Sequence, residues 1–184
     1  MRMTGLILLA ALAAPAANAV EYQTVLPKQS TIHFEFRQMG VPIKGGFKRF
    51  TTLMAFDPAR PEAARAQIEI DLASIDAGSP EADDESAGKL WFDRSVYPKA
   101  TFVSSQVRAL GNNRYEMRGT LTLKGRSREM VVPVTFSPGN QAAVFDGAFV
   151  LRRLDFGIGE GMWADVATVA NEVQVRFRIA ATGN

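Results

Sequence analysis

The chain has 184 residues, a formal net charge of +2 and no cysteine. This length suits one ordinary domain, and a charge near zero without a long run of lysine or arginine argues against a nucleic-acid partner. With no cysteine and a single histidine, His33, the chain has no disulfide and too few ligands for an ordinary zinc site. We therefore expect no catalytic residue, no cofactor and no metal.

The first 19 residues have the pattern of a secretory signal peptide. Arg2 precedes a short apolar run, and Ala17-Asn18-Ala19 has the small residues of a cleavage site. The apolar run is too short to cross a bilayer as a helix, and no later stretch is apolar enough to do so. We therefore expect residues 1–19 to be removed on export. Residues 20–184 would then form one domain in the periplasm, without stable membrane insertion.

Most of the remaining chain alternates apolar and polar residues, which is typical of half-buried β-strands. The clearest alternation lies in residues 32–36, 68–72, 115–121 and 173–179. Less regular candidates are residues 47–56, 101–110, 131–137, 143–151 and 162–167. Turn residues such as Gly45-Gly46 and Lys124-Gly125 separate them. The pattern predicts about eight or nine strands, joined at hairpin spacing.

One segment is expected to be helical. Ser79 can accept hydrogen bonds from free backbone N–H groups, and Pro80 suits the first helical position. The acidic residues that follow suit the positive end of a helix and are interpreted as a solvated face. We predict a helix from Ser79 to about Leu90, and a second short helical turn within residues 61–65.

The predicted strands have one apolar and one charged face, and the helices are too few to cover a sheet. Such an antiparallel sheet buries its apolar face against itself, as a sandwich or as a closed barrel. The interior is then either a core filled with aromatic side chains, the default for dense packing, or a barrel that holds one apolar ligand. Alternation alone does not distinguish these arrangements. The Gly-rich residues 157–161 lack the Lys-Ser/Thr ending of a phosphate loop and are interpreted as a loop or strand corner.

Several motifs occur in a characteristic order. The opening block is STIHFEFRQMGVPIKGGFKRF followed by AFDP. The central block holds Ser74-Ile75-Asp76, Trp91-Phe92-Asp93 and Tyr97-Pro98, followed by Phe102-Val103-Ser104. The last elements are GTLTLKG and LRRLDFGIG, the latter with Arg153, Asp155, Phe156 and Gly157. From Ser30 to about Ile179, this ordered set resembles the YceI-like family of polyisoprenoid-binding proteins.

The resemblance implies an all-β fold, an extended antiparallel eight-stranded lipocalin-like barrel with one or two short helices in its connections. It also implies an apolar lipid ligand, of the isoprenoid or quinone type, in the interior. Apolar strand faces are expected to supply Phe34, Phe36, Phe47, Ile70, Phe102, Leu121, Phe149 and Phe177 to the lining. Loops are expected to supply Trp91, Phe92, Phe156 and Trp163 to the mouth.

The chain departs from the family pattern at two places. It has Arg37-Gln38-Met39-Gly40 where the family often has Lys-His before Leu-Gly, and residues 81–85 lack the family's Arg-Asp pair. Both positions are expected near the ligand's polar end. We therefore interpret the chain as a divergent member with a different lipid or quinone-like ligand.

Three hypotheses for function follow. The first is a periplasmic binder or carrier of a long isoprenoid-type lipid, which is not an enzyme. The second is a small outer-membrane barrel; charged strand residues such as Glu69 and Arg176 and the absence of a terminal aromatic residue weigh against it. The third is a non-catalytic, partner-binding or stress-related barrel with a filled core. The sequence leaves open the identity of the lipid, its donor and acceptor, and whether the protein is a homodimer.

Overall fold

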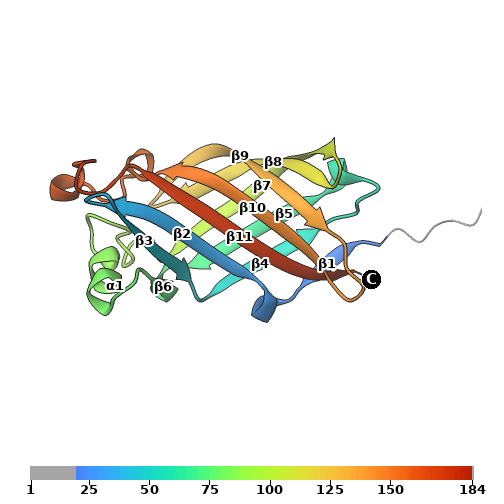
Figure 1. Ribbon diagram of the computed structural model, residues 1–184, viewed down its shortest axis with the longest axis horizontal. Helices are drawn as coiled ribbons and strands as arrows, with labels where there is room; N and C mark the ends of the chain where they lie inside the picture. The colour runs from blue at the N-terminus through green and yellow to red at the C-terminus, as the bar shows by residue number, and fades with distance from the viewer. Residues whose placement is uncertain (1–19, 184) are drawn as a thin grey trace, which may run out of the picture.

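The structure is a computed structural model that describes residues 20–183, so the predicted signal peptide lies outside the described residues. Within them, eleven strands form one antiparallel sheet that curls into an elongated, open barrel (Figure 1). The strands lie in the order β4-β5-β7-β8-β9-β10-β11-β2-β3-β6, and β1 pairs with β11. Their bounds are β1 Tyr22–Val25, β2 Thr31–Gln38, β3 Val41–Phe47, β4 Phe50–Ala55, β5 Arg65–Asp71, β6 Ile75–Asp76, β7 Lys99–Gly111, β8 Arg114–Leu123, β9 Arg126–Ser137, β10 Ala143–Arg152 and β11 Glu172–Gly183.

The all-β antiparallel class is confirmed, whereas the predicted count of eight strands was wrong and the barrel is open. β4 and β6 end the strand order, which leaves a seam between β3 and β4. Tyr22 of β1 bridges to Phe56 at one end of this seam. At the other end β6 pairs with β3, and the N–H of Lys48 donates to the carbonyl of Ser74 at 3.0 Å. The segments that span the seam, β1 and β6, are too short to show an alternating pattern.

Three two-residue turns fix the register of their hairpins. Met39-Gly40 joins β2 to β3, Asn112-Asn113 joins β7 to β8, and Lys124-Gly125 joins β8 to β9. All six residues have φ between 47° and 79°. Positive φ at both central positions is the type I′ turn, whose twist matches that of the flanking strands.

The structure places Gly45 inside β3, where the sequence pattern predicted a break. Gly45 pairs with Phe34 of β2, and a Cβ there would clash with the Phe34 ring and with the carbonyl of Asp76. Glycine in a strand often marks such a close approach. The glycine therefore leaves room for an aromatic ring on the inner face of the barrel.

The prediction of a strand in residues 162–167 was wrong. Gly161 has φ 61° and begins the 3-10 turn Gly161–Trp163. The carboxylate of Asp165 accepts a hydrogen bond from the N–H of Ala167 at 2.9 Å, which forms a local turn. The carbonyl of Trp163 accepts a hydrogen bond from the Arg153 guanidinium at 2.7 Å. These backbone groups therefore form hydrogen bonds within a loop and do not pair with a neighbouring strand.

The predicted helix is confirmed as α1, Pro80–Ala87, but it ends earlier than Leu90. Ser79 is its N-cap, because the Ser79 hydroxyl accepts from the N–H of Ala82 at 3.2 Å. Gly88 ends the helix, with its N–H bonded to the carbonyl of Glu85 at 3.0 Å. The predicted second turn is the 3-10 segment Pro61–Ala63. Further 3-10 turns are Pro27–Gln29, Leu72–Ser74 and Arg153–Phe156.

The two ends of the barrel differ. The end that carries β1 and the C-terminus is filled by aromatic rings, whose centroids lie between 5.1 and 6.5 Å apart. These residues are Tyr22, Phe56, Tyr115, Phe136 and Phe145. The opposite end carries α1 and the loop of residues 157–171 (Figure 1). The barrel is therefore a packed core at one end and encloses a cavity at the other.

Candidate ligand-binding site

An apolar cavity of about 450 Å³ lies in the half of the barrel nearest α1. Its walls come mainly from β2, β8, β10 and β11, and its lining also includes α1 and residues around Trp91 and Trp163. We call the end formed by α1 and residues 157–171 the mouth. The volume is within the usual range for small-molecule sites, and the lining is mostly aliphatic and aromatic, as such sites are.

The structure brings nine of the predicted lining residues together at this cavity. They are Phe34, Phe36, Phe47, Ile70, Trp91, Phe92, Leu121, Phe149 and Trp163. The other three lie elsewhere. The Phe102 and Phe177 rings lie against Gly119 and Gly147, where a Cβ would clash with them. Phe156 is 2 % exposed and packs in the core.

Some cavity residues were not singled out from the sequence. Val173 and Val175 share the parity of Phe177 on β11, so the alternating pattern could have identified them. Arg153 also contributes to the lining, but no periodic pattern marks it as a cavity residue. Glu81 and Glu85 line the cavity too, and they belong to residues 81–85, which were expected near the ligand's polar end. Their positions depend on how α1 and the loop after β10 fold over the mouth.

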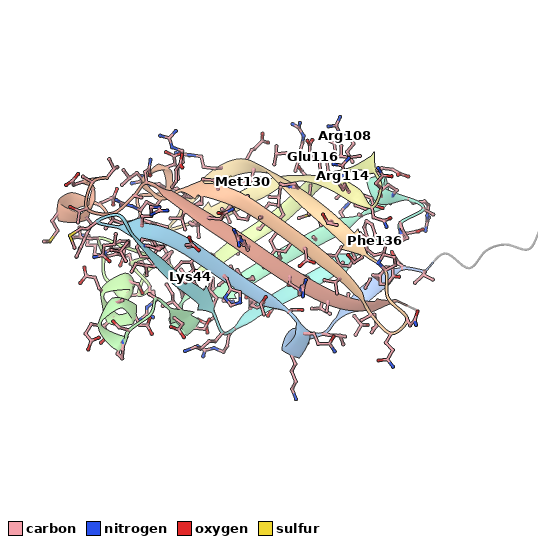
Figure 2. The ribbon with its side chains drawn as sticks, viewed as in Figure 1. Lys44, Arg108, Arg114, Glu116, Met130 and Phe136 are labelled. Carbon is pink, nitrogen blue, oxygen red and sulfur yellow. The ribbon has the colours of Figure 1, made fainter. Side chains whose placement is uncertain are left out.

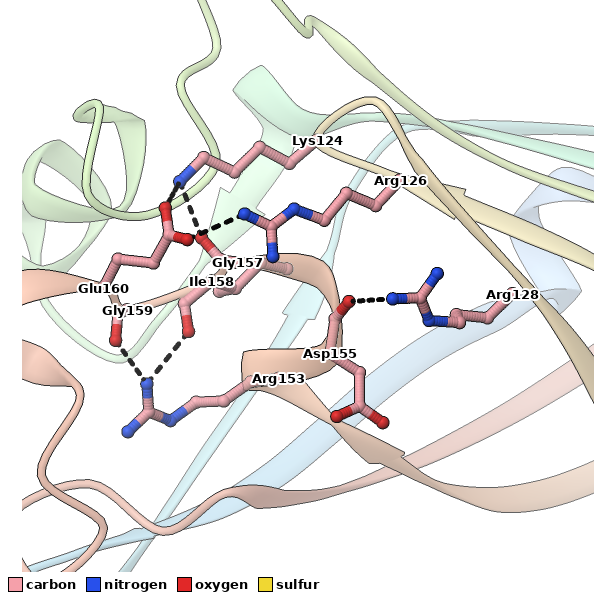
Figure 3. A network of polar contacts seen from close by, with 9 residues as sticks. All are labelled: Lys124, Arg126, Arg128, Arg153, Asp155, Gly157, Ile158, Gly159 and Glu160. Atoms are coloured by element: carbon pink, nitrogen blue, oxygen red, sulfur yellow. Dashed lines mark hydrogen bonds and ion pairs between the residues drawn. The ribbon is translucent and has the colours of Figure 1, made fainter.

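Arg153 is a charged residue that is 2 % exposed and lies at the cavity wall. Its guanidinium donates to backbone carbonyls, two of which, Ile158 and Gly159, are shown in Figure 3. The five acceptors are Ile158 at 2.9 Å, Gly159 at 2.7 Å, Trp163 at 2.7 Å, Val169 at 2.6 Å and Ala170 at 3.0 Å. Burial lowers the pKa of Arg153, yet an arginine stays protonated at neutral pH. Since the guanidinium has five N–H donors, all of them are used by the loop.

A second polar contact fixes the other side of the same loop (Figure 3). The Lys124 ammonium donates to the carbonyl of Gly157 at 2.6 Å and to the Glu160 carboxylate at 3.1 Å. Arg126 donates to the other Glu160 oxygen at 2.8 Å. The hydrogen bond from Lys124 lowers the pKa of the Glu160 carboxyl. The β8–β9 turn therefore anchors the Gly-rich loop at the mouth.

Polar and aromatic side chains meet at the mouth. Glu81 and Glu85 lie one helical turn apart on α1, and both line the cavity. The Trp163 Nε1 donates to Glu85 Oε1 at 2.9 Å, and the Trp163 ring lies 5.7 Å from the ring of Trp91. The Nε1 of Trp91 is buried and finds no hydrogen-bond partner among the described residues.

Exposed apolar side chains lie on the segments around the mouth. Leu90, Met39 and Met162 are 39 %, 73 % and 76 % exposed. Backbone hydrogen bonds tie these segments together, from Met39 to the carbonyl of Thr168 and from Gly159 to the carbonyl of Leu90. The apolar cavity is therefore bordered by apolar surface where it meets solvent.

Among residues 20–183, no helix is long and apolar enough to cross a membrane. In the same part of the chain, no three His, Cys, Asp or Glu side chains gather in a way that could hold a metal ion.

The sequence of this barrel matches a known family. A model of the YceI-like domain matches residues 23–181. The chain belongs to the YceI-like family. A UPF0312 protein of Vibrio cholerae is 32 % identical over 170 residues, which cover 86 % of this chain and 90 % of that protein. A UPF0312 protein of Pseudomonas savastanoi is 33 % identical over 159 residues, which cover 81 % of this chain and 82 % of the relative.

Two solved structures share the fold. BcnA of Burkholderia cenocepacia is 42 % identical and superposes with a TM-score of 0.84, over 86 % of this chain and 99 % of BcnA. A polyisoprenoid binding domain from Saccharophagus degradans superposes with a TM-score of 0.68, over 91 % of this chain and all of that domain, at 14 % identity. At that identity the second likeness shows the fold alone.

Proposed function

We propose that this YceI-like protein binds or carries a long apolar lipid, of the isoprenoid or quinone type, inside the barrel. The apolar cavity of about 450 Å³ carries this proposal, because it is open space in the half of the barrel that is not filled by aromatic rings. The Saccharophagus degradans neighbour, whose name describes polyisoprenoid binding, supports the choice of ligand class.

The energetics of such a site need few polar contacts. Moving one CH₂ group from water into an apolar interior is favourable by about 0.8 kcal/mol, so a long chain supplies most of the binding free energy. The phenylalanine, leucine and valine side chains of the wall offer that interior. The proposed role is binding without catalysis.

We also propose that the protein acts in the periplasm, which rests on the signal-peptide pattern of residues 1–19. Cell fractionation tests this location. Release of the protein with the periplasmic fraction, without detergent, supports it, and recovery in the cytoplasmic fraction contradicts it.

The outer surface argues against the alternative of a membrane barrel. Outward-facing strand residues carry charge, as Figure 2 shows for Arg108 and Arg114. Arg178 is also exposed and pairs with Asp146 at 2.8 Å across two neighbouring strands. A membrane barrel needs an apolar band on this face, because charged side chains in contact with lipid are costly. In the described residues the arrangement is opposite to that of a membrane barrel, because the charged face of the strands lies outside and the apolar face lies inside.

Organic extraction tests the ligand directly. Purified protein is extracted with chloroform and methanol, and the extract is analysed by mass spectrometry beside an unrelated protein purified from the same cells. A long-chain lipid that is enriched in the first extract, near one molecule per protein, is the expected result. An extract without any enriched apolar molecule, from protein that also takes up no lipid added in solution, would contradict the proposal and favour a partner-binding barrel.

A further inference from the structure

The mouth of the cavity is acidic. Glu81 and Glu85 project from the same face of α1, and both are exposed side chains that also line the cavity. Hydrogen bonds from its own backbone N–H and from Ser79 lower the pKa of Glu81, so this group is ionised at neutral pH. The Trp163 Nε1 already donates a hydrogen bond to Glu85 Oε1. A carboxylate oxygen accepts more than one hydrogen bond, so both glutamates can still accept from a ligand.

The cavity offers no matching positive group within the described residues. Arg153 is the one cation in its lining, and its five N–H groups already donate to five carbonyls. Lys124 and Arg126 both pair with Glu160 and lie outside the lining. An anionic ligand could recruit Arg153 only by taking N–H donors from buried carbonyls, which costs free energy for each carbonyl left unpaired.

We propose that the ligand of this cavity ends in a neutral or cationic hydrogen-bond donor, a hydroxyl or an amine, and that a phosphate end is disfavoured. This inference rests on the proposed function. A hydroxyl or ammonium group can donate to Glu81 or Glu85. A phosphate carries about −1.5 to −2 charges at neutral pH and would lose water beside two like charges without gaining a cation. The lipid tail provides affinity, and the glutamates select the head group.

The test compares lipids with one tail and different heads. Lipid-stripped protein is loaded with the neutral fluorescent probe N-phenylnaphthylamine, which is then displaced by geranylgeraniol, geranylgeranylamine or geranylgeranyl phosphate at pH 7. We expect the alcohol and the amine to displace the probe at lower concentrations than the phosphate, by about threefold or more for each carboxylate. Phosphate binding that equals or exceeds alcohol binding would overturn the inference while leaving the proposed function intact.

Two variants and a control assign the effect to the glutamates. Glu81→Gln and Glu85→Gln together keep the size of both side chains and one accepting oxygen on each, but remove their charge. The double variant should reduce the difference between the concentrations of phosphate and alcohol that displace the probe. Glu62→Gln, exposed on the 3-10 turn Pro61–Ala63, should leave this difference unchanged. An unchanged difference in the double variant would contradict the inference. If neither the probe nor any of the three lipids binds wild-type protein, the proposed function itself fails, and this inference fails with it.

Discussion

Arg153 shows how one buried side chain can hold a loop that lines the mouth. Its guanidinium is 2 % exposed and donates to five carbonyls between Ile158 and Ala170. In Arg153→Met, these carbonyls lose their donors inside the protein. Hydrogen bonds to charged groups contribute about 1.5–3 kcal/mol each, so we expect the free energy of unfolding to fall by about 3 kcal/mol or more. Urea denaturation at pH 7 measures this loss.

Arg152→Met is a matched control, because Arg152 is the preceding residue and its side chain is exposed. This variant should change the free energy of unfolding by less than about 0.5 kcal/mol, as is usual for surface substitutions. If Arg153→Met lowers the free energy of unfolding by no more than about 0.5 kcal/mol, as expected for Arg152→Met, the five hydrogen bonds of Arg153 contribute little to stability.

At the same scale, strand parity predicted much of the cavity lining. An alternating strand exposes every second residue to one face, which placed Phe34, Leu121 and Phe149 inside the barrel. Parity identifies the face but not the position along the barrel axis, so it also selected Phe177, which lies against Gly147. Strand alternation could not predict Arg153 as a lining residue, because Arg153 lies after the end of β10 and its partners are carbonyls of the irregular loop that follows.

At the scale of elements, capping chemistry predicted α1 and makes it testable. The helix has eight residues, a length that is marginal in isolation, so its N-cap matters. Ser79→Ala removes the hydroxyl that accepts from the N–H of Ala82 and should lower the free energy of unfolding by about 1 kcal/mol. A thermal melt detects this as a lower Tm. Ser105→Ala, at an exposed position of β7, is the control. If Ser79→Ala and Ser105→Ala have the same Tm, Ser79 does not stabilise the protein as a helix cap.

Elements without a local signal were missed. β3 contains Pro42 and Gly45-Gly46, yet it forms a strand because it pairs with β2 along its whole length, and Gly45 leaves space for the Phe34 ring. Residues 162–167 alternate as a strand does, but their backbone is used by the turn at Asp165 and by Arg153. In both places the alternation of apolar and polar residues was a poor guide, because strand pairing with β2 forms β3 and side-chain hydrogen bonds from Asp165 and Arg153 form the loop.

The whole molecule combines the two interiors that the sequence left open, a filled core and a hollow barrel. Aromatic rings such as Phe56 and Phe136 fill one end, and the cavity occupies the other. The rings at the filled end pack against one another, whereas the cavity walls at the other end face open space. A larger side chain on a cavity wall is therefore expected to reduce binding more than stability.

Leu121→Trp tests this separation, because Leu121 lines the cavity from β8 and is 8 % exposed. In a filled core, the larger side chain would cost about 1–3 kcal/mol of stability. In the cavity, the indole can occupy open space, so we expect a Tm close to wild type and a loss of lipid uptake. Titration with N-phenylnaphthylamine and melts without ligand measure both quantities.

Val103→Trp is the control, since Val103 is 47 % exposed and follows Phe102, the partner of Leu121 on β7. Retained uptake in Leu121→Trp would place the ligand outside this cavity, and a large fall in Tm would show that the wall around Leu121 is already packed.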